Sequence, residues 1–273
     1  MDLHPTSAGS EKQYHIGCKR GDLANYLLVP GDCDRVVKIA SFWDEFHEVC
    51  CHREFKSFTG KYKGVPISVM SSGIGPAATA ILVNEASRVG VKTLVRVGST
   101  GAIQKDIACG DLVISVGAVR FDGTSKHYIG IEYPAVASYE VMLALMEAAE
   151  RLAVKYHVGI TATSSDFYAG QARSSLSKSK KSETDSFIQM LQRANVLNFE
   201  MECATLFVLS SLFDLRAGAV CAVYANRITN EFKPGAGEED CIKVANKAVQ
   251  ILSDWDQMKR KKKKKWLLPN MLK

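Results

Sequence analysis

The sequence lacks the signatures of several common protein classes. No apolar run approaches the ~18–20 residues of a membrane span, and a run such as Ala217–Ala225 has only the length of a strand. The first 15 residues contain no apolar segment typical of a secretory signal, so we expect a cytoplasmic protein. Neither a P-loop motif nor a Gly-x-Gly-x-x-Gly fingerprint is present, which argues against two common nucleotide-binding folds.

The eight cysteines do not form a recognised metal-binding pattern. No two of them are spaced as Cys-x-x-Cys, and no histidine follows one at zinc-finger spacing. Cys109, Cys203 and Cys221 lie within apolar runs. We therefore expect reduced thiols that pack as small hydrophobic side chains, as is usual in the cytosol.

Positive charge is concentrated at one end of the chain. The 273 residues have a net charge of +6, but residues 259–273 hold eight basic side chains and no acidic one. The remainder carries 27 basic and 29 acidic residues, so its charge does not indicate a nucleic-acid-binding fold. We expect residues 258–273 to form a solvated, mobile tail, because like charges repel and Pro269 cannot continue a helix. Such a tail would contact nucleic acid only weakly.

Short β-branched runs alternate with stretches of helical periodicity. We predict strands at Tyr26–Val29, Val65–Met70, Thr93–Val97, Leu112–Val116, His157–Thr163 and Ala217–Asn226. We predict helices at Pro76–Val89, Tyr139–Lys155, Glu202–Phe213 and Glu238–Met258. This order indicates an α/β domain over residues 14–257, a three-layer sandwich with a mixed central β-sheet flanked by helices. Residues 1–13 are expected to be flexible, and Ser174–Ser186 to be a mobile surface segment.

Two segments are suited to hold an anion. In Val29–Arg35 a strand ends in a glycine-backed turn at Gly31, and Arg35 follows four residues later. In the second segment Arg96 interrupts an apolar strand, and Ser99 lies in the Gly/Ser/Thr-rich stretch after it. A buried cation needs a partner, and ligands of open α/β sheets gather at the carboxyl ends of strands. The alternatives are a plain turn into a helix with Arg35 on the surface, and a structural Arg–carboxylate pair for Arg96.

Two other segments are suited to hold an uncharged ring and a diol. In Phe167–Arg173, Gln171 and Arg173 are two residues apart, so in an extended chain they face the same way and can read a planar ring. In Asn198–Ala204 two carboxylates flank Met201, which suits a sugar. The alternatives are a polar surface loop and acidic residues at a helix N-terminus.

Taken together, these segments resemble the nucleoside phosphorylase family that contains the hexameric purine and uridine phosphorylases, in its uridine phosphorylase branch. The resemblance extends from about residue 14 to about residue 252. It rests on Tyr14–Gly17, Val29–Asp32, Asp34–Val36, His52–Phe55, Gly73–Gly75, Arg96–Ile103, Gly170–Arg173, Glu200–Glu202 and Asn226–Arg227.

The resemblance implies reversible phosphorolysis of uridine, with roles for individual residues. Phosphate would be held by Gly31, Arg35, Arg96 and Ser99, with Arg53 reaching in from a partner subunit. Ribose would be held by Met201, Glu202 and Arg96, with the partner's His15. Uracil would be read by Phe167, Gln171, Arg173 and Arg227, and catalysis would depend on Arg96, Gln171 and Arg173.

The resemblance also implies an assembly and a set of ligands. We expect a homodimer with shared active sites, in a trimer of dimers. Phosphate is the expected co-substrate, no organic cofactor is needed, and no membrane partner is expected. A monovalent cation would be bound by Glu54 at the dimer interface, but Ala78 stands where relatives carry a serine that helps to bind it.

Some residues depart from the family pattern or separate its branches. Asn226 stands where the purine branch has an aspartate that helps to protonate the leaving base, so a purine phosphorylase is the weaker alternative. A nucleosidase of the same fold and an inactive nucleoside-binding paralogue are the others. Ser99 replaces a threonine, Ala169 replaces a proline, and Tyr224-Ala225 replaces two aliphatic residues near the base.

Overall fold

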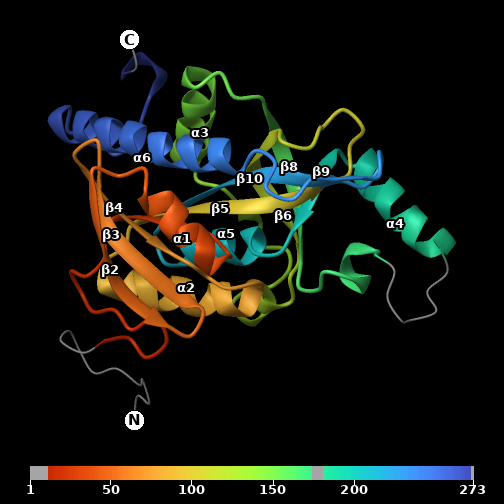
Figure 1. The fold of residues 1–273 in the computed structure, drawn as a ribbon, viewed down its shortest axis with the longest axis horizontal. Coiled ribbons are helices and arrows are strands. Elements are labelled where there is room, and N and C mark those ends of the chain that lie inside the picture. The colour runs from red at the N-terminus through yellow and green to blue at the C-terminus, as the bar shows by residue number, and fades with distance from the viewer. Residues whose placement is uncertain (1–11, 174–180, 272–273) are drawn as a thin grey trace.

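The computed structural model describes residues 12–173 and 181–271, which form one mixed sheet of eleven strands and six α-helices (Figure 1). The strands are β1 (Tyr26–Val29), β2 (Glu45–His52), β3 (Phe55–Tyr62), β4 (Val65–Met70), β5 (Thr93–Ala102), β6 (Leu112–Phe121), β7 (Ala135–Val136), β8 (Tyr156–Ser164), β9 (Val196–Glu200), β10 (Arg216–Asn226) and β11 (Glu231–Phe232). The helices are α1 (Cys33–Ala40), α2 (Pro76–Val89), α3 (Tyr139–Arg151), α4 (Lys181–Arg193), α5 (Cys203–Leu212) and α6 (Glu238–Lys261). The expected α/β class and mixed sheet are confirmed.

The sheet closes partly on itself. The strand order is β11-β10-β6-β8-β9-β5-β1-β4-β3-β2, β10 also pairs with β5, and β7 pairs with β6. The strands β10, β6, β8, β9 and β5 therefore form a closed ring, from which β1, β4, β3 and β2 extend as an open wing. The parallel neighbours β1, β5 and β10 run side by side, so their carboxyl ends lie at one edge.

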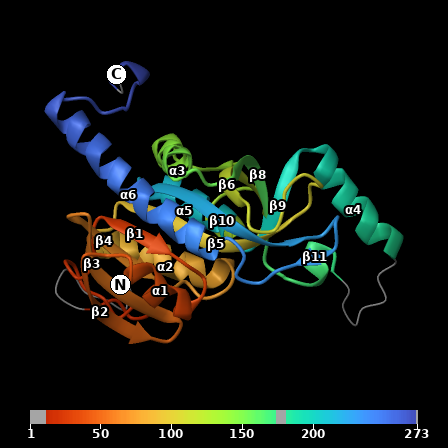
Figure 2. The same ribbon diagram turned by 45° about the horizontal axis from the view of Figure 1, so that its top comes forward.

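Helices cover both faces of this sheet. One buried cluster joins α1, α3 and α6 to the sheet, and a second joins α2 and α5 to it. In Figure 1, α6 and α3 lie above the strands and α2 lies below them, and Figure 2 shows α6 crossing over β10 and β5. These layers bury the apolar faces that the helical periodicity predicts.

Several predicted elements are confirmed, and others differ at their ends. β1, β4 and α2 have the predicted bounds, whereas β5 and β6 continue beyond them to Ala102 and Phe121. β5 extends because its Gly-rich end pairs with both β10 and β9. α3 ends at Arg151 instead of Lys155, since Ala153 adopts a left-handed backbone with φ of 52°.

The polar segment 174–186 was predicted to be a mobile surface segment, and its second part is helical. Residues from Lys181 onward belong to α4, whose apolar side chains Phe187 and Leu191 pack in a cluster with Phe199. Residues 174–180 lie outside the described part of the chain, as do residues 1–11 of the predicted flexible N-terminus.

The basic tail also differs from the prediction of a solvated, mobile segment. α6 continues to Lys261, and Lys259 Nζ lies 2.5 Å from Glu140 Oε2 and 3.1 Å from Asp256 Oδ1. After the exposed lysines, the backbone N–H of Leu267 donates to Tyr139 Oη, and the Leu267 side chain is buried. Burial of Leu267 and the pairing of Lys259 with the carboxylates of Glu140 and Asp256 thus outweigh the repulsion between the neighbouring lysines.

Other expectations concern the cysteines and the membrane. All eight cysteines are free thiols, and four of them are buried. None of the helices in residues 12–173 and 181–271 combines the length and apolar character needed to cross a bilayer.

Candidate active site

A cavity of about 950 Å³ lies at the carboxyl-end edge of the parallel strands. It brings together nine of the predicted site residues, namely Gly31, Arg35, Arg96, Ser99, Phe167, Gln171, Arg173, Met201 and Glu202. The four segments that the sequence singled out therefore meet in one place. Tyr224, Ala225 and Phe232 also line it; Phe232 lies on the short β11, which carries no strong sequence signal.

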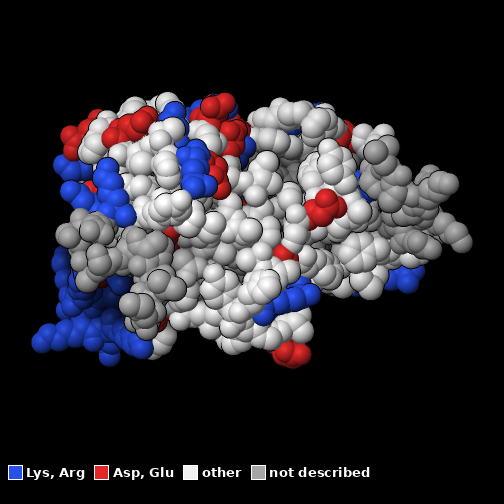
Figure 3. Space-filling model, turned by 90° about the horizontal axis from the view of Figure 1, so that it is seen from below, with Lys and Arg blue, Asp and Glu red and all other residues white. Residues whose placement is uncertain are grey.

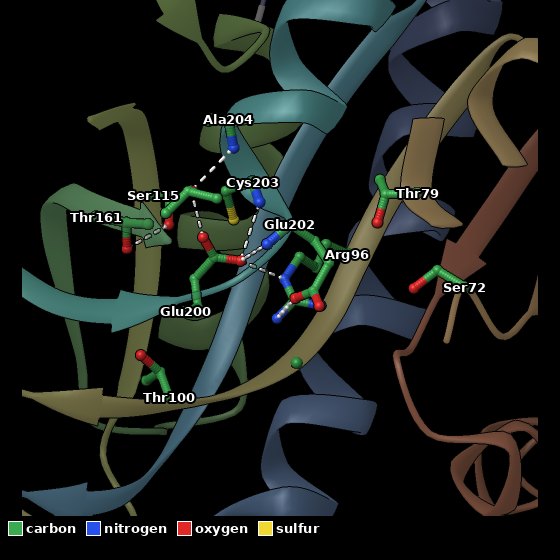
Figure 4. Close-up of polar contacts among 12 residues, drawn as sticks. Ser72, Thr79, Arg96, Thr100, Ser115, Thr161, Glu200, Glu202, Cys203 and Ala204 are labelled. Atoms are coloured by element: carbon green, nitrogen blue, oxygen red, sulfur yellow. Dashed lines mark hydrogen bonds and ion pairs between the residues drawn. The ribbon is translucent and has the colours of Figure 1, made fainter. Parts of the chain in front are cut away.

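Arg96 is held between two carboxylates, those of Glu200 and Glu202, and all three residues line the cavity (Figure 4). Its Nε lies 2.9 Å from Glu200 Oε2, and its Nη2 lies 2.6 Å from Glu202 Oε2. The Glu202 carboxylate also accepts the backbone N–H of Gly75 at 2.6 Å. The alternative of an Arg–carboxylate pair thus describes this arginine, and the acids come from residues more than a hundred positions away.

Burial sets the electrostatics of this group. Burial raises the pKa of Glu202, and the Arg96 charge opposes that rise. Burial alone would lower the pKa of Arg96, but Glu202 and the other acidic groups around it raise that pKa well above its ordinary value. One buried cation thus faces two acids, and the Glu202 carboxylate can accept a hydrogen bond from a hydroxyl of a ligand.

Glu200 is a structural support that sequence reasoning left without a role. Its Oε2 accepts the backbone N–H groups of Glu202 and Cys203 at 2.8 and 2.9 Å, at the start of α5. Its Oε1 accepts the Thr163 hydroxyl at 2.5 Å. Glu200 therefore fixes the turn that carries Met201 and Glu202 into the cavity.

The turn after β1 brings Arg35 to the cavity. Asp32 caps α1 by accepting the backbone N–H of Asp34 at 2.9 Å, so Arg35 lies in the first turn of that helix. Gly31 permits a close approach, because a Cβ there would lie 3.3 Å from the carbonyl oxygen of Gly73. The turn does enter a helix, but Arg35 is buried and lines the cavity, so the alternative that places it on the surface is wrong.

At the other end of the cavity, Arg173 lies over the Phe167 ring, with its guanidinium carbon 4.3 Å from the ring centroid. Its Nε is buried and has no hydrogen-bond partner among residues 12–173 and 181–271. Burial lowers the pKa of Arg173. The Gln171 side chain is buried, Arg173 is half-buried, and both line the cavity. They do so without the extended backbone considered above, since Ala169–Gln171 forms a 3₁₀ turn and Ala172 has a left-handed backbone.

Arg227 lies behind this loop and does not line the cavity. Its guanidinium donates to the backbone carbonyls of Gln171 and Ala172, and it packs over the Phe199 ring. Burial, together with the nearby Arg173 charge, lowers the pKa of Arg227 to about 10. Its contacts are those of a group that holds the loop, and direct contact with a base stays a prediction.

Three further predicted residues lie away from the cavity of their own chain. His15 Nδ1 pairs with Glu85 Oε1 at 2.6 Å, and the exposed Arg53 lies over the Tyr14 ring at 5.6 Å. Glu54 and Ala78 both lie next to Gly73: a Cβ added to Gly73 would lie 2.9 Å from the Cγ of Glu54 and 3.7 Å from the Cβ of Ala78. The roles of these residues toward a partner subunit or a cation stay predictions.

Comparison with known proteins identifies the family of this fold and cavity. A model of the phosphorylase superfamily matches residues 25–254. The chain belongs to this superfamily. It is 54% identical over 259 residues to a uridine phosphorylase of Thermococcus kodakarensis, covering 95% of this chain and 93% of the relative. It is 42% identical over 242 residues to a uridine phosphorylase of Klebsiella aerogenes, covering 88% of this chain and 94% of the relative. It is also 38% identical over 229 residues to a guanosine phosphorylase of Halorubrum lacusprofundi, covering 84% of this chain and 89% of the relative.

Proposed function

We propose that this phosphorylase catalyses the reversible phosphorolysis of uridine, in which uridine and phosphate give uracil and ribose 1-phosphate. The names of the relatives at 54% and 42% identity support the substrate, and the nine matching residues around one cavity support the reaction. Phosphate is the co-substrate, and the reaction needs no organic cofactor because phosphate itself displaces the base from C1′.

The observation that carries this proposal is the buried guanidinium Nε of Arg173, which has no hydrogen-bond partner among the residues that the structure describes. Uracil leaves C1′ with negative charge spread over its carbonyl oxygens, while the ribose gains oxocarbenium character. A desolvated donor that is already in place stabilises such developing charge without reorganisation. Gln171 fixes the ring edge, and Glu202 accepts hydrogen bonds from the ribose hydroxyls.

The opposite end of the cavity is suited to phosphate. Arg35 and Arg96 are buried side chains of the cavity wall, which Ser99 and Gly31 also line. These groups would place the phosphate beneath the sugar, opposite the departing base. Confinement of two reactants in one geometry supplies much of the rate enhancement in such a displacement.

We propose that the active enzyme is a homodimer, assembled further into a trimer of dimers. His15, whose backbone and ring contact Glu85 of α2, and Arg53 would complete the partner's site. Figure 3 looks onto the molecule from below, the side on which α2 lies in Figure 1, and much of that face is uncharged. The exposed Ile74, just before α2, and Tyr128, which contacts Asn84 of α2, support an apolar interface there. A monovalent cation bound by Glu54 at this interface is also part of the proposal. So is a cytoplasmic location, which the free thiols favour.

One relative favours a second candidate, the phosphorolysis of a purine nucleoside. Asn226 argues against it. Its amide nitrogen donates to the carbonyls of Gln104 and Ile107, and its oxygen accepts the N–H groups of Ile228 and Thr229. The Asn226 side chain is fully hydrogen-bonded to backbone groups, and as an amide it supplies no acid to protonate a purine.

Initial rates with uridine, guanosine and inosine, at equal concentrations and saturating phosphate, distinguish the two candidate functions. We expect uridine to be cleaved fastest, and faster cleavage of either purine nucleoside would reverse the assignment.

A further inference from the structure

Arg35 is held by three acceptors from three different parts of the chain. Its Nε lies 3.0 Å from Glu238 Oε2, its Nη1 lies 3.3 Å from the carbonyl oxygen of Val97, and its Nη2 lies 3.2 Å from Tyr224 Oη. Arg35 and Tyr224 line the cavity, whereas Glu238, the first residue of α6, lies behind them.

The Glu238 carboxylate is the common point of this cluster. It accepts the Tyr224 hydroxyl and pairs with Lys38 Nζ at 2.7 Å through its other oxygen. Arg35 and Lys38 lie three residues apart on one side of α1, so one carboxylate ties α1 and β10 to the start of α6. Burial would raise the pKa of Glu238, but Lys38, Tyr224 and Arg35 lower it to about 2, so it stays ionised at neutral pH.

A simple charge count makes Glu238 look unfavourable for an anion site. The cluster of Arg35, Lys38 and Glu238 has a net charge of +1, and removal of the carboxylate charge would raise it to +2. Lys38 is mostly exposed, however, and its charge is screened by solvent. The buried guanidinium of Arg35 is the group that faces the cavity, and its direction depends on Glu238 and Tyr224.

We propose that Glu238 and Tyr224 are positioning residues that orient the Arg35 guanidinium toward phosphate. This inference rests on the proposed function, because it assigns phosphate to the Arg35 end of the cavity. Tyr224 also shapes the cavity. Its hydroxyl contacts Glu238 and Arg35, and Tyr224 itself lines the cavity wall.

The test uses Glu238→Gln and Tyr224→Phe in the full-length protein. Phosphate affinity is measured by titration calorimetry, and the KM values for phosphate and uridine are measured separately. Loss of a hydrogen bond to a charged group weakens binding about tenfold. We therefore expect a phosphate Kd and KM about tenfold higher for Glu238→Gln, a smaller rise for Tyr224→Phe, and a uridine KM that changes less than about twofold.

The control is Glu239→Gln, the next residue along α6. Its exposed carboxylate pairs with Lys243 at 2.5 Å, so this variant removes the same charge from the same helix end without touching Arg35. We expect its phosphate Kd to equal that of the wild type. The double variant of Glu238 and Tyr224 should weaken phosphate binding by less than the product of the single effects, because both residues act on one guanidinium.

Three results would overturn the inference. Tighter phosphate binding by Glu238→Gln would show that the carboxylate acts only through its charge. A lower melting temperature with an unchanged phosphate Kd would show that the cluster is only a structural link between α1 and α6. Failure of the wild type to bind phosphate would remove its basis. If the wild type binds phosphate but does not cleave uridine, the proposed function fails, and the calorimetric comparison still decides the role of Glu238.

Discussion

The guanidinium Nη2 of Arg227 lies 2.9 Å from the carbonyl oxygen of Ala172, which connects the end of β10 to the loop that carries Gln171 and Arg173. Ala172 has a left-handed backbone with φ of 51°, a conformation that a residue with a side chain adopts only when its surroundings hold it. Arg227 thus holds the loop that carries Gln171 and Arg173 without lining the cavity itself.

Arg227→Met is expected to loosen this loop. The variant removes two hydrogen bonds to backbone carbonyls but keeps a side chain that can pack on Phe199. Each such bond contributes about 1.5–3 kcal/mol, so we expect kcat/KM for uridine to fall by at least about tenfold. Steady-state kinetics at saturating phosphate measure this change. An unchanged kcat/KM would show that the loop holds its shape without Arg227.

Arg173→Ala is expected to impair the departure of the base. Loss of a donor aimed at developing charge costs about 3–4 kcal/mol, or 10²–10³ in kcat. The phosphate KM should change less than about twofold, because Arg35 and Arg96 are untouched. Arg193→Ala, at the exposed end of α4, is the matched control and should behave as the wild type. A variant of Arg173 that loses only phosphate affinity would contradict the base-reading role.

Arg96→Ala is expected to abolish activity and also to destabilise the protein. The substitution leaves the buried carboxylates of Glu200 and Glu202 without their cation. Removal of one partner from a buried ion pair costs about 3–5 kcal/mol of unfolding free energy. Urea unfolding and uracil release measure the two effects. A folded variant with near-wild-type turnover would refute the placement of Arg96 in the site.

Mixing two inactive variants tests whether subunits share their sites. In a mixed dimer of Arg53→Ala and Gln171→Ala, one site keeps its own Gln171 and receives an intact Arg53 from the partner. We expect each variant alone to be nearly inactive and the mixture to recover part of the wild-type rate. Recovery must follow the extent of subunit exchange, which differently tagged chains report. Complete exchange without recovery would place Arg53 outside the partner's site.

Asp256 links stability to pH at the end of the sheet remote from the cavity. Burial would raise the pKa of Asp256, but Arg216, 2.6 Å away, and the Tyr26 hydroxyl lower it from 3.8 to about 2. A depressed carboxyl pKa stabilises the fold above pH ~4 and loses this effect as the pH falls toward ~2.

Asp256→Asn removes this contribution, and the pH dependence of unfolding reveals it. Between pH 5 and 2 the wild type should lose about 2 kcal/mol more unfolding free energy than the variant. Equal losses in denaturant titrations would show that the Arg216 pair adds nothing to stability. The activity at neutral pH should be unaffected, because Asp256 does not line the cavity.

Local patterns in the sequence predicted some elements well and missed others. β1, β4 and α2 have clear apolar periodicity and the predicted bounds. β2 was missed because most of its side chains are exposed, so its sequence shows no buried face. α6 was predicted to end at Met258, but Lys259 continues it by pairing with Glu140, a residue 119 positions away.

The site shows the same division. The sequence motifs predicted nine of the residues that line the cavity, because their segments have unusual charge or glycine content. The residues that pair with these side chains were not predicted. Glu238 contacts Arg35 across 203 positions, and Glu200 contacts Arg96 across 104, so only the folded topology reveals these pairs. Isolated charges read from a sequence can thus have partners that no local pattern indicates.

The most direct test of the central claim is the release of uracil from uridine, measured with and without phosphate. Phosphorolysis predicts release only in the presence of phosphate, with one ribose 1-phosphate formed for each uracil, and synthesis of uridine when uracil and ribose 1-phosphate are supplied instead. Release at the same rate without phosphate would identify a nucleosidase, and uridine binding with no release under either condition would identify a nucleoside-binding protein; either result would contradict the account.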